Sequence, residues 1–283
     1  MAIEFRQVGY SYSKNKNNID KAIYNINLSI EGKNEFVGIL GHTGSGKSTL
    51  MQHINGLILP TNGEVVVFDN IITNKKRKNP KMKSIRKQIG FVFQFPEYQL
   101  FEETVLKDIM FGPMNFGFTE EEAKESAIKY AKLLNIEHIL DKSPFELSGG
   151  QMRKVAIAGV LAYEPDILLL DEPTRGLDPK GAKDIMDFFN YMNKEYNKTI
   201  IMITHDMDLA YEHVNRLVVL KEGKIEFDGN KEDLFISEIY KDLHLKKPLI
   251  LDSIDELNNN LNLNLNYNIK TIEELVEKLR GDI

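Results

Sequence analysis

The sequence predicts an α/β fold in which a mostly parallel β-sheet forms the core and helices cover it. Predominantly apolar runs at residues 35–40, 167–170 and 199–203 are typical of strands buried on both faces of a parallel sheet. Segments with the helical spacing of apolar residues separate these runs, and such alternation of strands and helices is the pattern of α/β proteins. We therefore expect an α/β core with a helical insertion at residues 95–145.

The first strands in the chain carry a different pattern. Residues 3–8 and 22–30 are predicted strands on either side of the polar segment 13–21. In the second of them apolar and polar residues alternate, as in an antiparallel strand with one buried face. Two more short strands are expected at 64–68 and 89–93. The alternation predicts an antiparallel β subdomain beside the core.

The middle of the chain becomes helical between residues 104 and 140. Thr119 is the expected N-cap of one helix, and the acidic residues 120–122 that follow suit the positive end of the helix dipole. Late in the chain, residues 215–220 and 224–227 are expected to form a hairpin.

The composition changes beyond residue 248. The stretch 258–268 alternates Asn with Leu and could be either a flexible linker or a short strand-like segment. A short amphipathic helix is expected at 271–279. Its apolar face carries Ile272, Leu275, Val276 and Leu279. Such a face requires a partner surface, which could belong to this chain or to a second one.

Composition limits the possible chemistry. The chain has no cysteine, which excludes disulfides, thiolate chemistry and cysteine-ligated metal sites. A net charge of −6 argues against nucleic acid as the main partner. The basic run at 75–78, followed by Lys81 and Lys83, is interpreted as a solvated loop. No run approaches the roughly 18 apolar residues that cross a bilayer, and the N-terminus lacks a signal-peptide pattern.

The strongest functional motif lies between the first core strand and a predicted helix at 48–54. Residues 41–48 fit the phosphate-binding pattern G-x-x-x-x-G-K-S/T. Its glycines let backbone N–H groups turn toward one anion, the helix N-terminus adds partial positive charge, and Lys47 supplies a full charge. The Ser48 hydroxyl is the expected ligand of Mg²⁺. The predicted binding residues are Gly41, His42, Thr43, Gly44, Ser45, Gly46, Lys47, Ser48 and Thr49. This motif predicts binding of a nucleoside triphosphate.

Four polar residues at predicted strand ends extend this prediction. Asp171 is placed to hold Mg²⁺, and Glu172 to activate an attacking water. His205 could hydrogen-bond a γ-phosphate, and Gln94 could ligate Mg²⁺ or a water and report phosphate occupancy to the helical insertion. Each of these residues alone is also compatible with an ordinary polar strand end. Their combination with the phosphate loop favours the catalytic interpretation.

A second motif indicates a family. Residues Leu147, Ser148, Gly149, Gly150 and Gln151 resemble the signature motif of ATP-binding-cassette (ABC) ATPases. A serine hydroxyl, glycine N–H groups and a helix N-terminus make this segment a second anion receptor. The resemblance implies a P-loop NTPase fold, ATP and Mg²⁺ as ligands, and a head-to-tail dimer. In that dimer each ATP lies between the phosphate loop of one subunit and the signature of the other.

Further positions match the same family over residues 1–240. Tyr12 matches the aromatic residue that stacks on adenine, and Asp178 lies in the loop that crosses the dimer interface. Because Glu172 and His205 are both present, the resemblance implies that the chain hydrolyses ATP.

The family pattern also suggests a division of the chain. Residues 1–94 and 146–240 form the expected ATP-binding core with its β subdomain. Residues 95–145 form a helical subdomain, and residues 241–283 form a C-terminal extension that adds dimer contacts.

Within the ABC ATPases, the sequences of three segments resemble those of the ATP-binding subunits of energy-coupling factor (ECF) transporters. These are residues 93–105, 111–113 and 155–162, and the first is most similar to the second of the two ATPase types. ECF transporters import vitamins or transition-metal ions such as cobalt or nickel. The resemblance implies a peripheral ATPase at the cytoplasmic face of the cell membrane. Its partners would be a sister ATPase or a second copy, a membrane coupling subunit and a substrate-binding membrane subunit, without nucleic acid. Arg175 departs from the small residue expected there, and a contact with the partner is one interpretation.

Two other functions remain open at this point. A soluble, non-transport ABC ATPase that acts on DNA or the ribosome usually carries a coiled coil or two cassettes in tandem, which this chain lacks. The ATPase of an ordinary ABC importer would use the same chemistry with other membrane partners. Only the resemblance of residues 95–105 argues against it.

Overall fold

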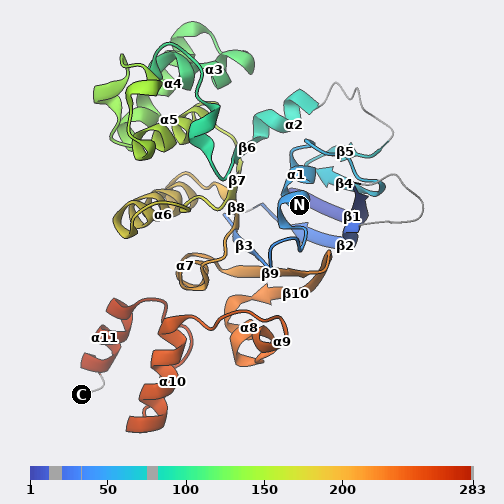
Figure 1. The fold of residues 1–283 in the computed structure, drawn as a ribbon, viewed down its shortest axis with the longest axis vertical. Coiled ribbons are helices and arrows are strands. Elements are labelled where there is room, and N and C mark those ends of the chain that lie inside the picture. Colours follow the sequence, from blue (N-terminus) through green and yellow to red (C-terminus); the bar gives the residue numbers. More distant parts are fainter. Residues whose placement is uncertain (13–20, 33, 75–81, 282–283) are drawn as a thin grey trace.

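The computed structural model describes residues 1–12, 21–32, 34–74 and 82–281, shown in Figure 1. The predicted basic run at 75–78 with Lys81, and the polar segment apart from its last residue, lie outside the described residues. The described chain folds into two β-sheets with helices packed on them, which confirms the predicted α/β fold class.

The larger sheet has six strands in the order β10-β9-β3-β8-β7-β6. They are β3 (Phe36–Leu40), β6 (Ile89–Val92), β7 (Ile167–Asp171), β8 (Thr199–Ile203), β9 (Arg216–Lys221) and β10 (Lys224–Asn230). All are parallel except β10, which pairs antiparallel with β9 in the predicted hairpin. The three apolar runs form the central strands β3, β8 and β7, which are buried almost throughout. Their carboxyl ends meet at one edge, where α/β folds bind their ligands.

The smaller sheet is antiparallel, as predicted, with the order β2-β1-β4-β5. Its strands are β1 (Ile3–Ser11), β2 (Lys21–Ile30), β4 (Asn62–Val67) and β5 (Asn70–Ile72). The prediction missed β5, because three residues are too few to show an alternation. Helix α1 (Lys47–Ile54) buries Leu50, Met51 and Ile54 in the apolar core that the two sheets share.

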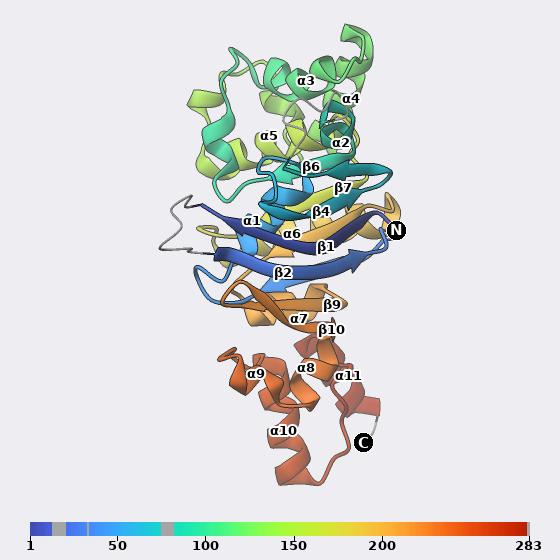
Figure 2. The same ribbon diagram turned by 90° about the vertical axis from the view of Figure 1, so that its right-hand side faces the viewer.

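A helical group lies at one end of the long axis of the molecule (Figures 1 and 2). It contains α3 (Val105–Asn115), α4 (Glu120–Leu133) and α5 (Gly149–Leu161), and α2 (Met82–Gln88) precedes it in the chain. Thr119 caps α4 in a capping box with Glu122, as the sequence predicted. Helix α5 begins after residue 145, the predicted end of the helical insertion, yet it packs on α3 and α4 as well as on the core sheet.

Two helices follow strands of the core sheet. Helix α6 (Pro179–Glu195) presents Met186, Phe189 and Met192 to the apolar core formed with β7 and β8. Helix α7 (Met207–His213) follows β8 and begins at the N-cap Asp206. Together with α1 they leave the carboxyl ends of the parallel strands open.

The C-terminal helices lie at the opposite end of the long axis from α3 and α4 (Figure 1). They are α8 (Lys231–Ile236), α9 (Ile239–Asp242), α10 (Leu249–Leu261) and α11 (Ile272–Gly281). The Asn-rich stretch is neither a linker nor a strand in its first part, because residues 258–261 complete α10. The side chain of Asn258 then bonds the backbone of Leu265 in both directions, at 2.9 and 2.8 Å, while Leu265 is buried. The Asn258 amide thus bonds the backbone N–H and carbonyl of Leu265, as a neighbouring strand would in a sheet.

Helix α11 confirms the predicted amphipathic segment, but only part of its apolar face is buried in this chain. Leu275 is buried in this chain's own core, whereas Ile272 is 69% exposed. None of the helices in the described part of the chain is long and apolar enough to cross a membrane.

Candidate active site

The phosphate loop joins β3 to α1 at the edge where the parallel strands end. Gly41, Gly44 and Gly46 have positive φ angles of 138°, 81° and 103°. A Cβ added to Gly46 would lie 2.5 Å from the carbonyl oxygen of Ala22, and one on Gly41 would lie 2.2 Å from that of Leu220. A side chain at Gly41 or Gly46 would therefore strain the backbone and clash with a neighbouring strand or turn.

Lys47 is buried inside the loop that it follows. Its Nζ donates hydrogen bonds to the carbonyl oxygens of Gly41 (2.7 Å) and His42 (2.8 Å). Burial lowers the pKa of Lys47, and the charges of Glu172 and Asp171 oppose that shift. Phosphate oxygens carry charge and accept stronger hydrogen bonds than neutral carbonyls. The ammonium group can therefore exchange its loop partners for an incoming phosphate.

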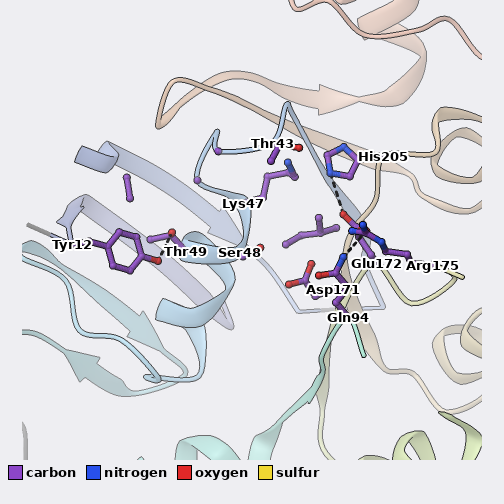
Figure 3. Close-up of a pocket in the computed structure, with 14 residues that line it drawn as sticks. Tyr12, Thr43, Lys47, Ser48, Thr49, Gln94, Asp171, Glu172, Arg175 and His205 are labelled. Atoms are coloured by element: carbon purple, nitrogen blue, oxygen red, sulfur yellow. Dashed lines mark hydrogen bonds and ion pairs between the residues drawn. The ribbon is translucent and has the colours of Figure 1, made fainter. Parts of the chain in front are cut away.

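A cavity of about 800 Å³ opens beside the loop (Figure 3). Its walls come from distant parts of the chain: Tyr12, Ala22, Thr43, Gly44, Gly46, Lys47, Ser48, Thr49, Gln94, Asp171, Glu172, Arg175, Ile203 and His205. The fold thus gathers the predicted adenine-stacking residue, most of the loop, and every residue predicted to act in catalysis or to ligate Mg²⁺. The remaining loop residues, Gly41, His42 and Ser45, do not line the cavity. A cavity of this size suits a small-molecule ligand.

Two observations bear on how well this cavity fits a nucleotide. The Oγ of Ser45 and Nε2 of His53 are buried without a hydrogen-bond partner among the described residues, but neither residue lines the cavity, so neither atom indicates a ligand there. Tyr12 is 64% exposed on the cavity wall, and its hydroxyl lies 3.0 Å from Thr49 Oγ1. Its open ring can stack on a planar base.

Ser48 and Asp171 form the part of the site suited to a hard cation. Burial and the neighbouring charge of Glu172 raise the pKa of Asp171, whereas a hydrogen bond with Ser48 and the charge of Lys47 act in the opposite direction. No cluster of three or more His, Cys, Asp or Glu that could hold a metal occurs in the described part of the chain. This donor set fits Mg²⁺, which proteins hold through one or two carboxylates while phosphates and waters complete its shell.

Glu172 lies at the centre of a hydrogen-bond cluster (Figure 3). Its Oε1 lies 3.1 Å from Nε2 of His205, and its Oε2 accepts from Nε2 of Gln94 (3.1 Å) and from Nη1 of Arg175 (3.0 Å). Burial lowers the pKa of His205, and the positive charge of Lys47 lowers it further. Both effects favour the neutral imidazole, whose single N–H can donate to Glu172 when the proton is on Nε2.

Arg175 is the residue at this site that sequence reasoning left without a role. Its guanidinium contacts Glu172 of its own chain, and the interpretation as a partner contact stays a prediction. Its spacing of three residues from Glu172, in the turn that follows a buried strand, is the sequence signal that could have indicated this ion pair. Periodicity does not distinguish Arg175 from any exposed arginine, and the family resemblance marks it only as a departure from the expected small residue.

The predicted signature residues do not meet the phosphate loop within this chain. Ser148 caps α5 in a capping box with Gln151, and the positions where Gly149 and Gly150 would carry a Cβ have open space around them. Ser148, Gly150 and Gln151 line a separate hollow of about 360 Å³, together with Asp178. Leu147 is buried beneath this end of α5. One chain therefore presents two separate faces that could bind phosphate.

Comparison with known proteins agrees with this architecture. The ABC transporter family model matches residues 23–175. Among solved structures, cbiO1 from Clostridium perfringens, described as part of the ABC transporter complex cbiONQ, superposes with a TM-score of 0.73 at 36% identity. That match covers 90% of this chain and 98% of the other. An ATP-binding cassette solved as a dimer in a post-hydrolysis state with ADP and Pi superposes with a TM-score of 0.71 at 35% identity, covering 81% and 98%.

Curated relatives give a narrower assignment. The energy-coupling factor transporter ATP-binding protein EcfA2 of Bacillus licheniformis is 45% identical over 283 residues, which cover 99% of this chain and 97% of the relative. The protein of the same name from Enterococcus faecalis is 51% identical over 236 residues, covering 83% and 81%. The chain therefore belongs to the ABC transporter family, in its group of energy-coupling factor transporter ATP-binding proteins.

Proposed function

We propose that this chain is the ATP-binding and ATP-hydrolysing subunit that powers an ECF-type importer of vitamins or transition-metal ions. The observation that carries the proposal is the placement of Glu172 and Lys47 on the walls of one cavity at the carboxyl edge of the sheet. The names of the relatives support the importer assignment, and they give no support to a soluble, non-transport ATPase or to an ordinary importer ATPase.

ATP binding begins at the phosphate loop. Loop N–H groups and Lys47 hold the phosphates, and Tyr12 stacks on the adenine. Mg²⁺ held by Ser48, Asp171 and the amide oxygen of Gln94 would neutralise charge on the phosphates. The cavity then holds the γ-phosphate near Glu172 and His205.

Hydrolysis requires a water placed in line with the γ-phosphate. Glu172 accepts a proton from that water as general base. His205 would turn the one N–H of its neutral ring from Glu172 to the phosphate, where it stabilises the developing charge, and Lys47 supplies a positive charge on the other side. Gln94 contacts Glu172 and leads into the helical group, so it can report the state of the site to that group.

The two phosphate-binding faces of the chain require a second subunit. A sister ATPase or a second copy would place its signature over this chain's ATP, and this chain's Ser148 and Gly150 would serve the other nucleotide. Asp178, in the hollow beside the signature, would lie at the interface. The dimeric cassette among the structural neighbours supports this arrangement, and the exposed Ile272 of α11 supports a dimer contact in the C-terminal extension.

Opening and closing of such a dimer would drive membrane partners. The segment that leads from Gln94 to the helical group carries exposed aromatic side chains, among them Tyr98 and Phe101 at 83% and 55% exposure. We place a membrane coupling subunit on this segment, with a separate substrate-binding membrane protein beside it. The chain would then work at the cytoplasmic face of the membrane.

Affinity purification from detergent-solubilised membranes of the native host tests this assignment. A tagged chain should retain at least one integral membrane protein and a second cassette ATPase, and the complex should release phosphate from MgATP. A tagged Lys47→Ala chain is the control for nucleotide-dependent assembly. Recovery with ribosomes or DNA and without any membrane protein would contradict the importer assignment while leaving the ATPase assignment intact.

A further inference from the structure

The turn that carries Glu172 brings Arg175 back onto the carboxylate. Glu172 has a left-handed φ of 49°, and its backbone N–H donates to Ile203 in the neighbouring strand (3.0 Å). The N–H of Arg175 donates to the carbonyl of Glu172 (3.1 Å), which closes the turn. The Arg175 side chain, 55% exposed, can therefore reach the Glu172 side chain, of which only 16% is exposed. In Figure 3, Arg175 and Lys47 lie on opposite sides of Glu172.

Other contacts fix the position of Arg175. Its guanidinium lies over the ring of Phe95, 5.9 Å from the centroid. Its carbonyl accepts a hydrogen bond from Nη1 of the buried Arg153 (2.7 Å), whose Nη2 pairs with Glu97 at 3.4 Å. Phe95 and Glu97 belong to the segment between β6 and the helical group. The ion pair is thus part of a connected set of contacts and does not depend on a free surface side chain.

This ion pair affects what Glu172 can do as a base. A carboxylate offers about four lone-pair positions on its two oxygens, and here His205, Gln94 and Arg175 occupy three of them. The first two donors are neutral. The guanidinium is always charged and holds the carboxylate by Oε2. It therefore competes for this oxygen with the water that Glu172 would activate.

We infer that Arg175 is a positioning residue that holds the Glu172 carboxylate and slows basal ATP hydrolysis until it moves off Glu172. The inference rests on the proposed ATPase function and adds a restraint to it. The ring of Phe95 would keep the guanidinium in place when the ion pair with Glu172 breaks, because this contact does not involve the carboxylate. Nucleotide-driven closure with the partner ATPase would then release the base only in the assembled state.

The test uses two variants that keep the backbone contact of Arg175 with Arg153. Arg175→Met removes the charge but keeps a long side chain against Phe95, and Arg175→Lys keeps the charge. An exposed ion pair contributes at most about 1 kcal/mol, which corresponds to about a fivefold change in rate. Steady-state phosphate release by the purified chain should show kcat raised up to about fivefold in Arg175→Met, with the KM for MgATP unchanged, and kcat near the wild-type value in Arg175→Lys.

The exposed Lys183 on α6 provides a matched control, because Lys183→Ala removes a positive charge that lines neither the cavity nor the hollow beside the signature, and it should leave kcat unchanged. A kcat for Arg175→Met that is unchanged or reduced would overturn the inference, since Arg175 would then be inert or would stabilise phosphate charge directly. An equal rise in both variants would also overturn it, because the charge would not be the cause. Equal phosphate release by the wild type and by Glu172→Gln would instead contradict the proposed function itself.

Discussion

Replacement of Glu172 by glutamine is the most direct test of the proposed chemistry. Glu172→Gln keeps the shape of the side chain and removes its ability to accept a proton. The amide oxygen can still accept from Gln94 and Arg175, which both contact Oε2 in the wild type. The new NH₂ group faces Nε2 of His205, and the neutral imidazole can change tautomer and accept that hydrogen bond.

The structural cost of this substitution is therefore small. The main loss is one ion pair to a side chain that is 55% exposed, worth about 1 kcal/mol or less. The catalytic cost is much larger, because a general base contributes roughly 10²- to 10⁴-fold to the rate. We expect kcat to fall by at least about a hundredfold, while the affinity for ATP stays within a few-fold and the melting temperature hardly changes.

Single-turnover phosphate release and light scattering in MgATP together measure the effect. The variant should retain unhydrolysed ATP and accumulate as a dimer, alone or with the sister ATPase, because the bound triphosphate still joins the two subunits. Glu125→Gln, on the exposed surface of α4, is the matched control and should behave as the wild type. A Glu172→Gln protein that releases phosphate at a near-normal rate would refute the assignment of Glu172 as the base.

Three further predictions follow from the same geometry. Lys47→Ala removes a buried ammonium group from the loop, so ATP affinity measured by calorimetry should fall by roughly 10- to 150-fold, and unchanged affinity would count against the loop. Gly46→Ala would place a Cβ 2.5 Å from the Ala22 carbonyl oxygen at φ 103°, so it should lower the free energy of unfolding by at least about 1–2 kcal/mol; a wild-type melting curve would contradict the strain argument. Burial lowers the pKa of His53 to about 4, below its value in the unfolded chain, so the stability gained from the neutral ring is complete above about pH 6.5 and is lost as the pH falls toward 4. As the pH falls across this range, the free energy of unfolding measured in urea should drop by up to roughly 3 kcal/mol more in the wild type than in His53→Gln. Parallel pH profiles of the two proteins would argue against a neutral buried ring.

The parts of the fold that sequence could predict are those set by local pattern. Central strands such as β7 and β8 are buried on both faces, so most of their residues must be apolar. The four apolar residues at 167–170 and at 200–203 suffice to show it. Thr119 and the acidic turn after it were sufficient to predict the start of α4, because a capping box involves residues only three apart. The phosphate loop is predictable for a similar reason, since its glycines and Lys47 act through the backbone of one short segment.

The rest depended on contacts between distant segments. The first residues of the Asn-rich stretch complete α10, and an irregular segment follows. Asn258 bonds Leu265 in that segment, and Leu265 is buried in the core. An alternating pattern alone favours neither outcome. In the cluster around Glu172, sequence predicts Glu172, His205 and Gln94 only as residues at three separate strand ends. The participation of Arg175 follows from the left-handed turn at Glu172, and no residue type requires that turn.

Arg153 gives the two phosphate-binding faces of the chain a physical connection. It lies on α5, the helix that begins at the signature motif, and only 4% of it is exposed. Its guanidinium donates to the carbonyls of Pro173 and Arg175, in the turn of Glu172, and pairs with Glu97. A buried guanidinium cannot lose these partners without a large desolvation cost, so a shift of α5 must either move the turn or rotate the arginine with it. Engagement of the signature by a partner's ATP would in this way reach the base of this chain's own site, and hydrolysis at the two sites would be coupled through one side chain.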